Sequence, residues 1–98
     1  MASIRAKLFA GQYVTTQHFL DRCKERHLEA KAVVLAAANG SIIEDYPEDA
    51  RGHSCLILTS SGEYALHVLV GVAYVEIRMI TAYSPNPDAW DSSFQKRR

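Results

Sequence analysis

The pair Asn39-Gly40 marks a change of residue pattern that constrains the fold more than any other feature of the chain. Before it, the segments "TTQHFLDRCKERHL" and "EAKAVVLAAANG", residues 15–28 and 29–40, have helical spacing or a high alanine content. Asn-Gly is a strong helix stop because glycine adopts the left-handed conformation at little cost. After Gly40 the pattern becomes extended. The sequence pattern therefore predicts two N-terminal helices followed by strands.

Four segments after Gly40 have the composition of β-strands. They are "SIIEDY" (41–46), "SCLILTS" (54–60), "EYALHVLVGV" (63–72) and "VEIRMITAY" (75–83). "SSG" at residues 60–62 predicts a hairpin turn between the second and third strands. Helices followed by strands predict an α+β domain, in which two helices pack on one face of a four-stranded, mainly antiparallel sheet.

The C-terminal residues predict a short helix. Asn86-Pro87-Asp88 has the order of an N-cap, a proline at the first helical position and an acid in the first turn. Trp90 and Phe94 are four residues apart, so we expect both side chains to pack this helix onto the sheet. A detachable aromatic helix that binds a partner is the alternative.

Length and charge limit the classes of function. Ninety-eight residues predict one domain, residues 1–98, with one hydrophobic core. Lys plus Arg and Asp plus Glu each number 11, which counts against broad electrostatic capture of nucleic acid but allows a local basic patch. No segment has the length or character of a signal peptide or a membrane span. We therefore expect a cytoplasmic protein whose two cysteines are reduced thiols.

A basic stripe lies on the helix predicted over residues 15–28, which Thr15 or Thr16 should cap. Its members are His18, Arg22 and Arg26, spaced four apart beside the apolar arc of the helix. The cationic side chains of such a stripe can bind phosphate groups. Alternatively, the two arginines lay their alkyl stems along the rim of the core and pair with Glu25 or Asp21. Spacing alone does not distinguish these interpretations.

Metal and cofactor chemistry are not expected. Cys23 and His27 share a helical face at a spacing that can hold zinc, and His18, His53 and Cys55 are further candidate ligands. However, there is no second close pair of ligands, and Cys23 lies on the apolar arc. The sequence also contains no glycine-rich phosphate loop and no nucleophile elbow.

Several motifs occur in an order that resembles a bacterial family known as domain of unknown function 4258. The motifs are "HFLDRCKER", "IIEDYPED", "SCLIL", "ALHVLV" and "MITAYSPNPDAW", over roughly residues 13–94. The family pattern falls on His18, Arg22, Arg26, Tyr46, Pro47, His67, Thr81, Tyr83, Pro85 and Trp90. The apolar "GVAY" at residues 71–74 departs from the polar turn of many relatives.

This family looks like the superfold of RelE and barnase-like ribonucleases, which has two N-terminal helices and a four-stranded antiparallel sheet. The resemblance implies a single RelE-like α+β domain over residues 1–98. It also implies an RNA-cleaving, toxin-like enzyme or an RNA-binding relative, with RNA or the ribosome and an antitoxin-like protein as partners. Fold analogy alone does not assign the chemistry.

Metal-independent RNA cleavage needs a base, an acid and cations beside the reacting phosphate. On the family pattern, the expected catalytic residues are His18, Arg22, His67 and Tyr83, and the expected substrate-binding residues are Arg26, Tyr46 and Thr81. The two histidines would transfer protons in a groove between the first helix and the sheet. Against this, a histidine within "ALHVLV" is more often buried and bonded to a main-chain carbonyl.

The rival expectation is a non-catalytic interaction module that dimerises through a sheet edge or through the aromatic tail. Convergence of His18, Arg22, His67 and Tyr83 on one solvent-open pocket would favour the enzyme. Two histidines on opposite faces, or both sealed in the core, would count against it.

Overall fold

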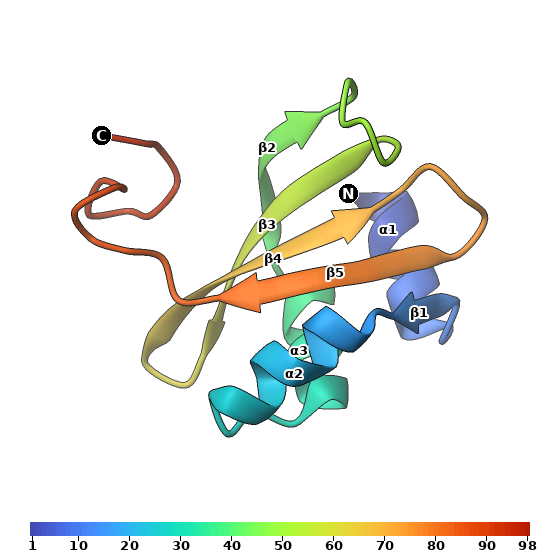
Figure 1. Ribbon diagram of the computed structural model, residues 1–98, viewed down its shortest axis with the longest axis horizontal. Helices are drawn as coiled ribbons and strands as arrows, with labels where there is room; N and C mark the ends of the chain where they lie inside the picture. The colour runs from blue at the N-terminus through green and yellow to red at the C-terminus, as the bar shows by residue number, and fades with distance from the viewer.

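The computed structural model describes residues 1–98 as three helices packed against one five-stranded sheet (Figure 1). The elements are α1 (Ala2–Phe9), β1 (Tyr13–Thr15), α2 (Gln17–Glu25), α3 (Ala30–Ala38), β2 (Ser41–Tyr46), β3 (Ser54–Ser61), β4 (Tyr64–Gly71) and β5 (Ile77–Tyr83). The strand order is β1-β5-β4-β3-β2. The longest helices, α2 and α3, have nine residues, and no helix is long and apolar enough to cross a bilayer.

The predicted sheet of four mainly antiparallel strands is wrong, and so is the predicted pair of helices, although the class remains α+β. A fifth strand, β1, pairs in parallel with β5, so the sheet is mixed. Three residues are too few to show the alternation that predicts a strand. The additional helix, α1, buries only Ile4 and Leu8, so its sequence carries little of the apolar periodicity that predicts a helix.

The predicted C-terminal helix is also wrong. Asn86 begins a single turn, in which its side-chain oxygen accepts the main-chain N–H of Asp88 at 2.9 Å. The chain then turns again because the carboxylate of Asp91 accepts the N–H of Ser93 at 3.1 Å. Residues 84–98, red in Figure 1, therefore form successive turns without a helix. We call residues 84–98 the tail.

Thr16 joins the start of α2 to the last strand. Its Oγ1 accepts the N–H of Phe19 at 3.0 Å, which confirms the predicted N-cap. The same hydroxyl donates to the main-chain oxygen of Ile80 at 2.9 Å, and the N–H of Thr16 donates to that of Met79 at 3.1 Å. The helix N-terminus is thereby fixed beside β5.

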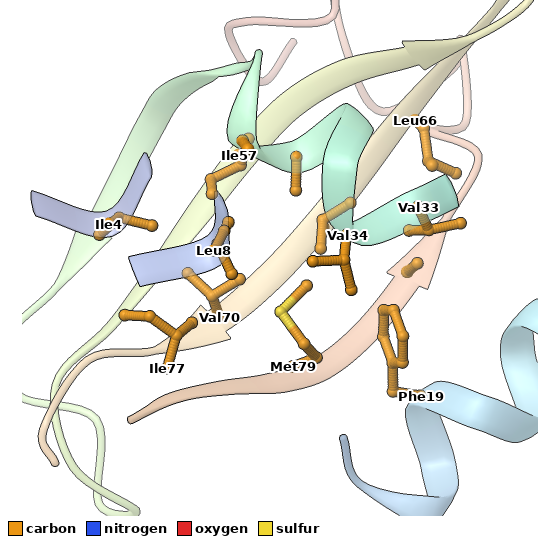
Figure 2. Packing of buried hydrophobic residues seen from close by; sticks show 14 of the residues in the cluster. Ile4, Leu8, Phe19, Val33, Val34, Ile57, Leu66, Val70, Ile77 and Met79 are labelled. Atoms are coloured by element: carbon orange, nitrogen blue, oxygen red, sulfur yellow. The ribbon is translucent and has the colours of Figure 1, made fainter. Parts of the chain in front are cut away.

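All three helices cover one face of the sheet and share one hydrophobic core with it. In Figure 2, Leu8 of α1 and Val34 of α3 lie next to the strand residues Val70 and Met79. Strand residues alternate between faces. His67, between buried neighbours on β4, therefore belongs to the opposite face, which the tail partly covers.

Gly40 ends the helical part of the chain for a reason other than the predicted one. The helix stops at Ala38, but Gly40 is not among the glycines with positive φ. A Cβ at this position would lie 2.5 Å from the main-chain oxygen of Leu58 and 2.6 Å from Cγ2 of Ile57. Gly40 is therefore needed because the chain passes closely over β3.

Candidate functional site

The three residues of the basic stripe have different surroundings. Arg22 forms an ion pair with Glu25 at 3.0 Å, and its buried Nε makes no hydrogen bond. Arg26 is the C-terminal cap residue of α2, and its Nη1 lies 3.4 Å from the hydroxyl oxygen of Ser84. His18 lines a pocket at the other end of the helix. Because a helix rises about 1.5 Å per residue, the two ends of the stripe are about 12 Å apart.

His67 is enclosed by the sheet and the tail. It is fully buried, with Nε2 2.8 Å from the main-chain oxygen of Phe94 and Nδ1 3.2 Å from the hydroxyl of Tyr83. The ring of Trp90 packs edge-on against it at a centroid distance of 4.4 Å. Burial lowers the pKa of His67, so the neutral ring donates to Phe94 and accepts from Tyr83. Both ring nitrogens are thus occupied within the protein.

Tyr46 belongs to a second set of contacts that holds the tail. Its hydroxyl donates to the carboxylate of Glu44, which also binds Arg97 through two N–O pairs of 3.1 Å each. The guanidinium of Arg97 lies 4.6 Å from the ring centre of Trp90. Burial alone would raise the pKa of Glu44, but hydrogen bonds from Arg97 and Tyr46 bring it below its ordinary value. This set fastens the tail to β2.

Thr81 lies on β5 opposite Leu69 and makes no side-chain hydrogen bond to another expected site residue. Tyr83 lies opposite His67 on the same pair of strands. The structure therefore brings His67 and Tyr83 together, but it places His18, Arg22 and Arg26 elsewhere. The seven expected residues do not share one pocket, so the convergence that would favour the enzyme is not observed.

The pocket that contains His18 has a volume of about 260 Å³. It lies between the start of α2, the β2–β3 loop, the β4–β5 turn and β5. Its charged or titratable lining residues are His18, Arg51, His53, Tyr74 and Arg78, and no lining residue is acidic. We call this the cationic pocket.

Two arginines of the cationic pocket differ in their partners. Arg51 is held by Asp49, with Nη2 3.3 Å from Oδ2. The N–H of Arg51, the hydroxyl of Ser54 and the Arg51 side chain lower the pKa of Asp49 to about 2. Arg78 is exposed and makes no salt bridge. Its charge is therefore available to an anion.

Glycines allow the walls of the pocket to come together. Gly52 has φ +106°, and a Cβ there would lie 2.8 Å from Cβ of Ala73. Gly71 lies opposite Arg78, where a Cβ would be 3.3 Å from that of the arginine. The β2–β3 loop and the β4–β5 turn can thus approach each other beside the arginine.

Sequence reasoning missed Arg51, Tyr74 and Arg78 as site residues. Arg78 was visible as a polar position in the last strand, and Arg51 as part of a polar loop. Their proximity depends on strand order and on the apolar turn at residues 71–74, which carries no polar turn signal. The three side chains with clustered metal-ligand atoms are Asp45, His53 and Cys55. The sequence did not pair Asp45 with the other two.

The profile of a family described as Domain of unknown function (DUF4258) matches residues 15–84. This range contains every residue that lines the cationic pocket, but it excludes α1 and the aromatic residues of the tail. No curated protein and no solved structure is significantly similar to the chain. The expected RelE-like superfold is therefore not confirmed. Because the match covers most of the chain, the protein belongs to the DUF4258 family.

Proposed function

We propose that the protein binds RNA through phosphate groups in the cationic pocket and cleaves it without a metal ion. The observation that carries this proposal is a pocket lined by two arginines and two histidines with no acidic residue. Guanidinium groups bind phosphate in a bidentate manner, and imidazole titrates near neutral pH. The cytoplasm, where RNA is abundant, is the proposed location.

The size of the pocket favours a piece of a longer chain as the ligand. Its volume of about 260 Å³ is below the roughly 300–1,000 Å³ typical of pockets that enclose drug-sized molecules. A phosphate with its ribose at the protein surface suits a hollow of this size. Tyr74, which is 68% exposed at its rim, can stack on a neighbouring base.

In the proposed reaction, His18 takes the proton of a ribose 2′-hydroxyl as that oxygen attacks the adjacent phosphorus. Arg51 and Arg78 stabilise the negative charge that develops on the phosphoryl oxygens. The bond from phosphorus to the 5′-oxygen breaks, and this oxygen takes a proton from water. The protonated His18 then gives its proton to the resulting hydroxide, which restores both the water and the neutral imidazole. The products are a 2′,3′-cyclic phosphate and a 5′-hydroxyl end. His18 is exposed, so substrate and solvent can both reach it.

RNA binding without cleavage is a second candidate function. It is favoured by the burial of His67, which leaves His18 as the one expected proton-transfer histidine that solvent can reach. A protein of zero net charge would then hold RNA through a few local contacts. Both candidates use the same arginines, so one set of variants separates them.

The test uses single-stranded RNA, excess chelator, and the wild type beside His18→Asn and Arg78→Gln. Matched controls are His27→Asn, an exposed histidine outside the pocket, and Lys31→Gln, an exposed cation on α3. Circular dichroism confirms the folding of each variant. We expect His18→Asn to lower the cleavage rate by about 10²- to 10⁴-fold. Arg78→Gln should weaken RNA binding, and neither control should do so.

The chemical nature of the RNA product ends and the activities of the variants distinguish cleavage at the pocket from binding alone. Cyclic phosphate ends that depend on His18 support cleavage at the pocket. RNA binding that depends on Arg78 without cleavage supports the binding function alone. Equal cleavage by all variants identifies a contaminating nuclease, and absence of binding by the wild type overturns both candidates.

A further inference from the structure

We propose that Asp45, His53 and Cys55 form a zinc-binding site at the end of the β2–β3 ladder. This metal site goes beyond the proposed RNA function and does not rest on it. The three residues offer a carboxylate, an imidazole and a thiol, which are all established zinc ligands.

The β2–β3 register brings the three side chains to one face. Asp45 lies directly opposite Cys55 in the antiparallel ladder. His53 precedes Cys55 by two residues, and side chains two apart along an extended chain point to the same face. The site is therefore fixed by regular strand pairing and not by the conformation of a long loop.

The ligand atoms lie close enough to share one ion. An imidazole nitrogen of His53, Sγ of Cys55 and a carboxylate oxygen of Asp45 all lie within 4.8 Å of one another. Sγ of Cys55 is 3.3 Å from Oδ1 of Asp45, and Nε2 of His53 contacts the same oxygen. Ligand atoms around tetrahedral zinc are about 3.3–3.6 Å apart, given the usual bond lengths. Small side-chain movements would complete this geometry.

The mixture of donors selects the kind of metal. Magnesium and calcium prefer oxygen donors alone, whereas a thiolate with an imidazole suits zinc. Binding would release the proton of the Cys55 thiol to solvent. Three protein ligands leave a fourth position for water.

Solvent can reach this site although one ligand is buried. Cys55 is only 4% exposed, whereas the side chains of His53 and Asp45 are 42% and 56% exposed. An ion can therefore enter from the surface and meet the thiol at the edge of the core. His53 also lines the cationic pocket, so zinc would add positive charge at its wall.

Cobalt(II) titration of the reduced, metal-free full chain tests the site. A thiolate ligand gives a near-ultraviolet charge-transfer band, and tetrahedral cobalt gives intense visible bands; zinc should then displace the cobalt and abolish both. Cys55→Ser should remove the charge-transfer band, whereas the matched control Cys23→Ala, at the other buried thiol, should keep it. Asp45→Asn and His53→Gln should each weaken cobalt binding by more than about 10-fold, since even changes to outer-sphere partners of metal ligands cost 10- to 100-fold.

Because Cys55 is buried, its replacement can destabilise the fold, so Asp45→Asn at an exposed position provides the independent variant. The proposal is overturned if folded wild type gives no thiolate band, or if the band persists in Asp45→Asn and His53→Gln with unchanged affinity. It is also overturned if Cys23→Ala, and not Cys55→Ser, abolishes the band. No RNA is present in this experiment, so its failure is distinct from failure of the proposed RNA function.

Discussion

Nε2 of His67 lies 2.8 Å from the main-chain oxygen of Phe94, which joins the centre of the sheet to the tail. Phe94 has φ +58°, a backbone conformation that a bulky residue rarely adopts. The hydrogen bond helps to hold this conformation over a fully buried imidazole. A sheet face that would otherwise expose a polar ring is thereby closed.

His67 should make stability depend on pH. Burial lowers its pKa in the folded state from the ordinary value of 6.5. Below pH 6.5 the unfolded chain binds a proton at this histidine that the folded protein excludes. The free energy of unfolding should therefore decrease as the pH is lowered. The stabilisation is complete above the ordinary value and is lost as pH falls toward the lower pKa of the folded state. Urea unfolding between about pH 7 and about pH 5 measures this slope.

His67→Gln should have a smaller slope over the same range, because glutamine does not titrate. His27→Asn, which removes an exposed histidine, serves as the control and should keep the wild-type slope. Equal slopes in all three proteins would mean that the burial of His67 has no effect on its protonation.

Trp90→Ala should lower the unfolding free energy by about 3–5 kcal/mol, the usual cost of truncating a large buried aromatic residue. Trp90 is 3% exposed and packs between His67 and Arg97. Urea unfolding followed by circular dichroism measures the loss. Tyr64→Ala, at a ring that is 77% exposed, should cost less than about 1 kcal/mol. A similarly small loss for Trp90→Ala would show that the tail is not docked in solution.

Gly40→Ala should destabilise the protein by about 1–3 kcal/mol through overpacking. The added methyl group would meet the main chain of Leu58 and the side chain of Ile57, neither of which can move without disturbing β3. Ser41→Ala, at the exposed next residue, should change stability by less than about 0.5 kcal/mol. Thermal or urea unfolding of both variants tests the difference. A stable Gly40→Ala protein would argue against the close approach.

Arg78→Gln should reduce the salt dependence of RNA binding, whereas Arg22→Gln should leave it nearly unchanged. Each phosphate contact with a single strand contributes about −0.7 to the slope of log affinity against log salt. Arg78 is unpaired and lines the cationic pocket, whereas Arg22 is paired with Glu25. Fluorescence anisotropy of labelled RNA over a salt series measures both slopes. A larger effect at Arg22 would move the RNA site to the basic stripe.

Local patterns were sufficient to predict much of the chain. The cap at Thr16, the helices α2 and α3 and the strands β2 to β5 were visible because each contains enough residues to show a period or a stop signal. Parallel pairing of β1 with β5 was not visible, because it joins residues far apart in the sequence through three pairs only. Such pairing depends on the tertiary fold.

The candidate site was less predictable than the fold. The sequence identified His18, which lines the cationic pocket, but it grouped this residue with Arg22 and His67. Helical spacing did allow for the acidic partner of Arg22, which is Glu25, but it could not show that a tail covers His67. Arg78 was missed because its place in the pocket depends on which loops lie beside it, and these are set by the tertiary fold.

The hydrogen bond from Thr16 to Ile80 spans 64 residues, so the pairing of β1 and of the start of α2 with β5 can form only after the last strand has been synthesised. At about 5–20 residues per second, ribosomes need roughly 3–13 s to make the intervening chain. During that interval Phe19 and the rest of the apolar face of α2 lack the strand that covers them. A nascent chain that ends before β5 therefore leaves the apolar face of α2 uncovered, and transiently exposed apolar surface of this kind makes a chain prone to aggregation.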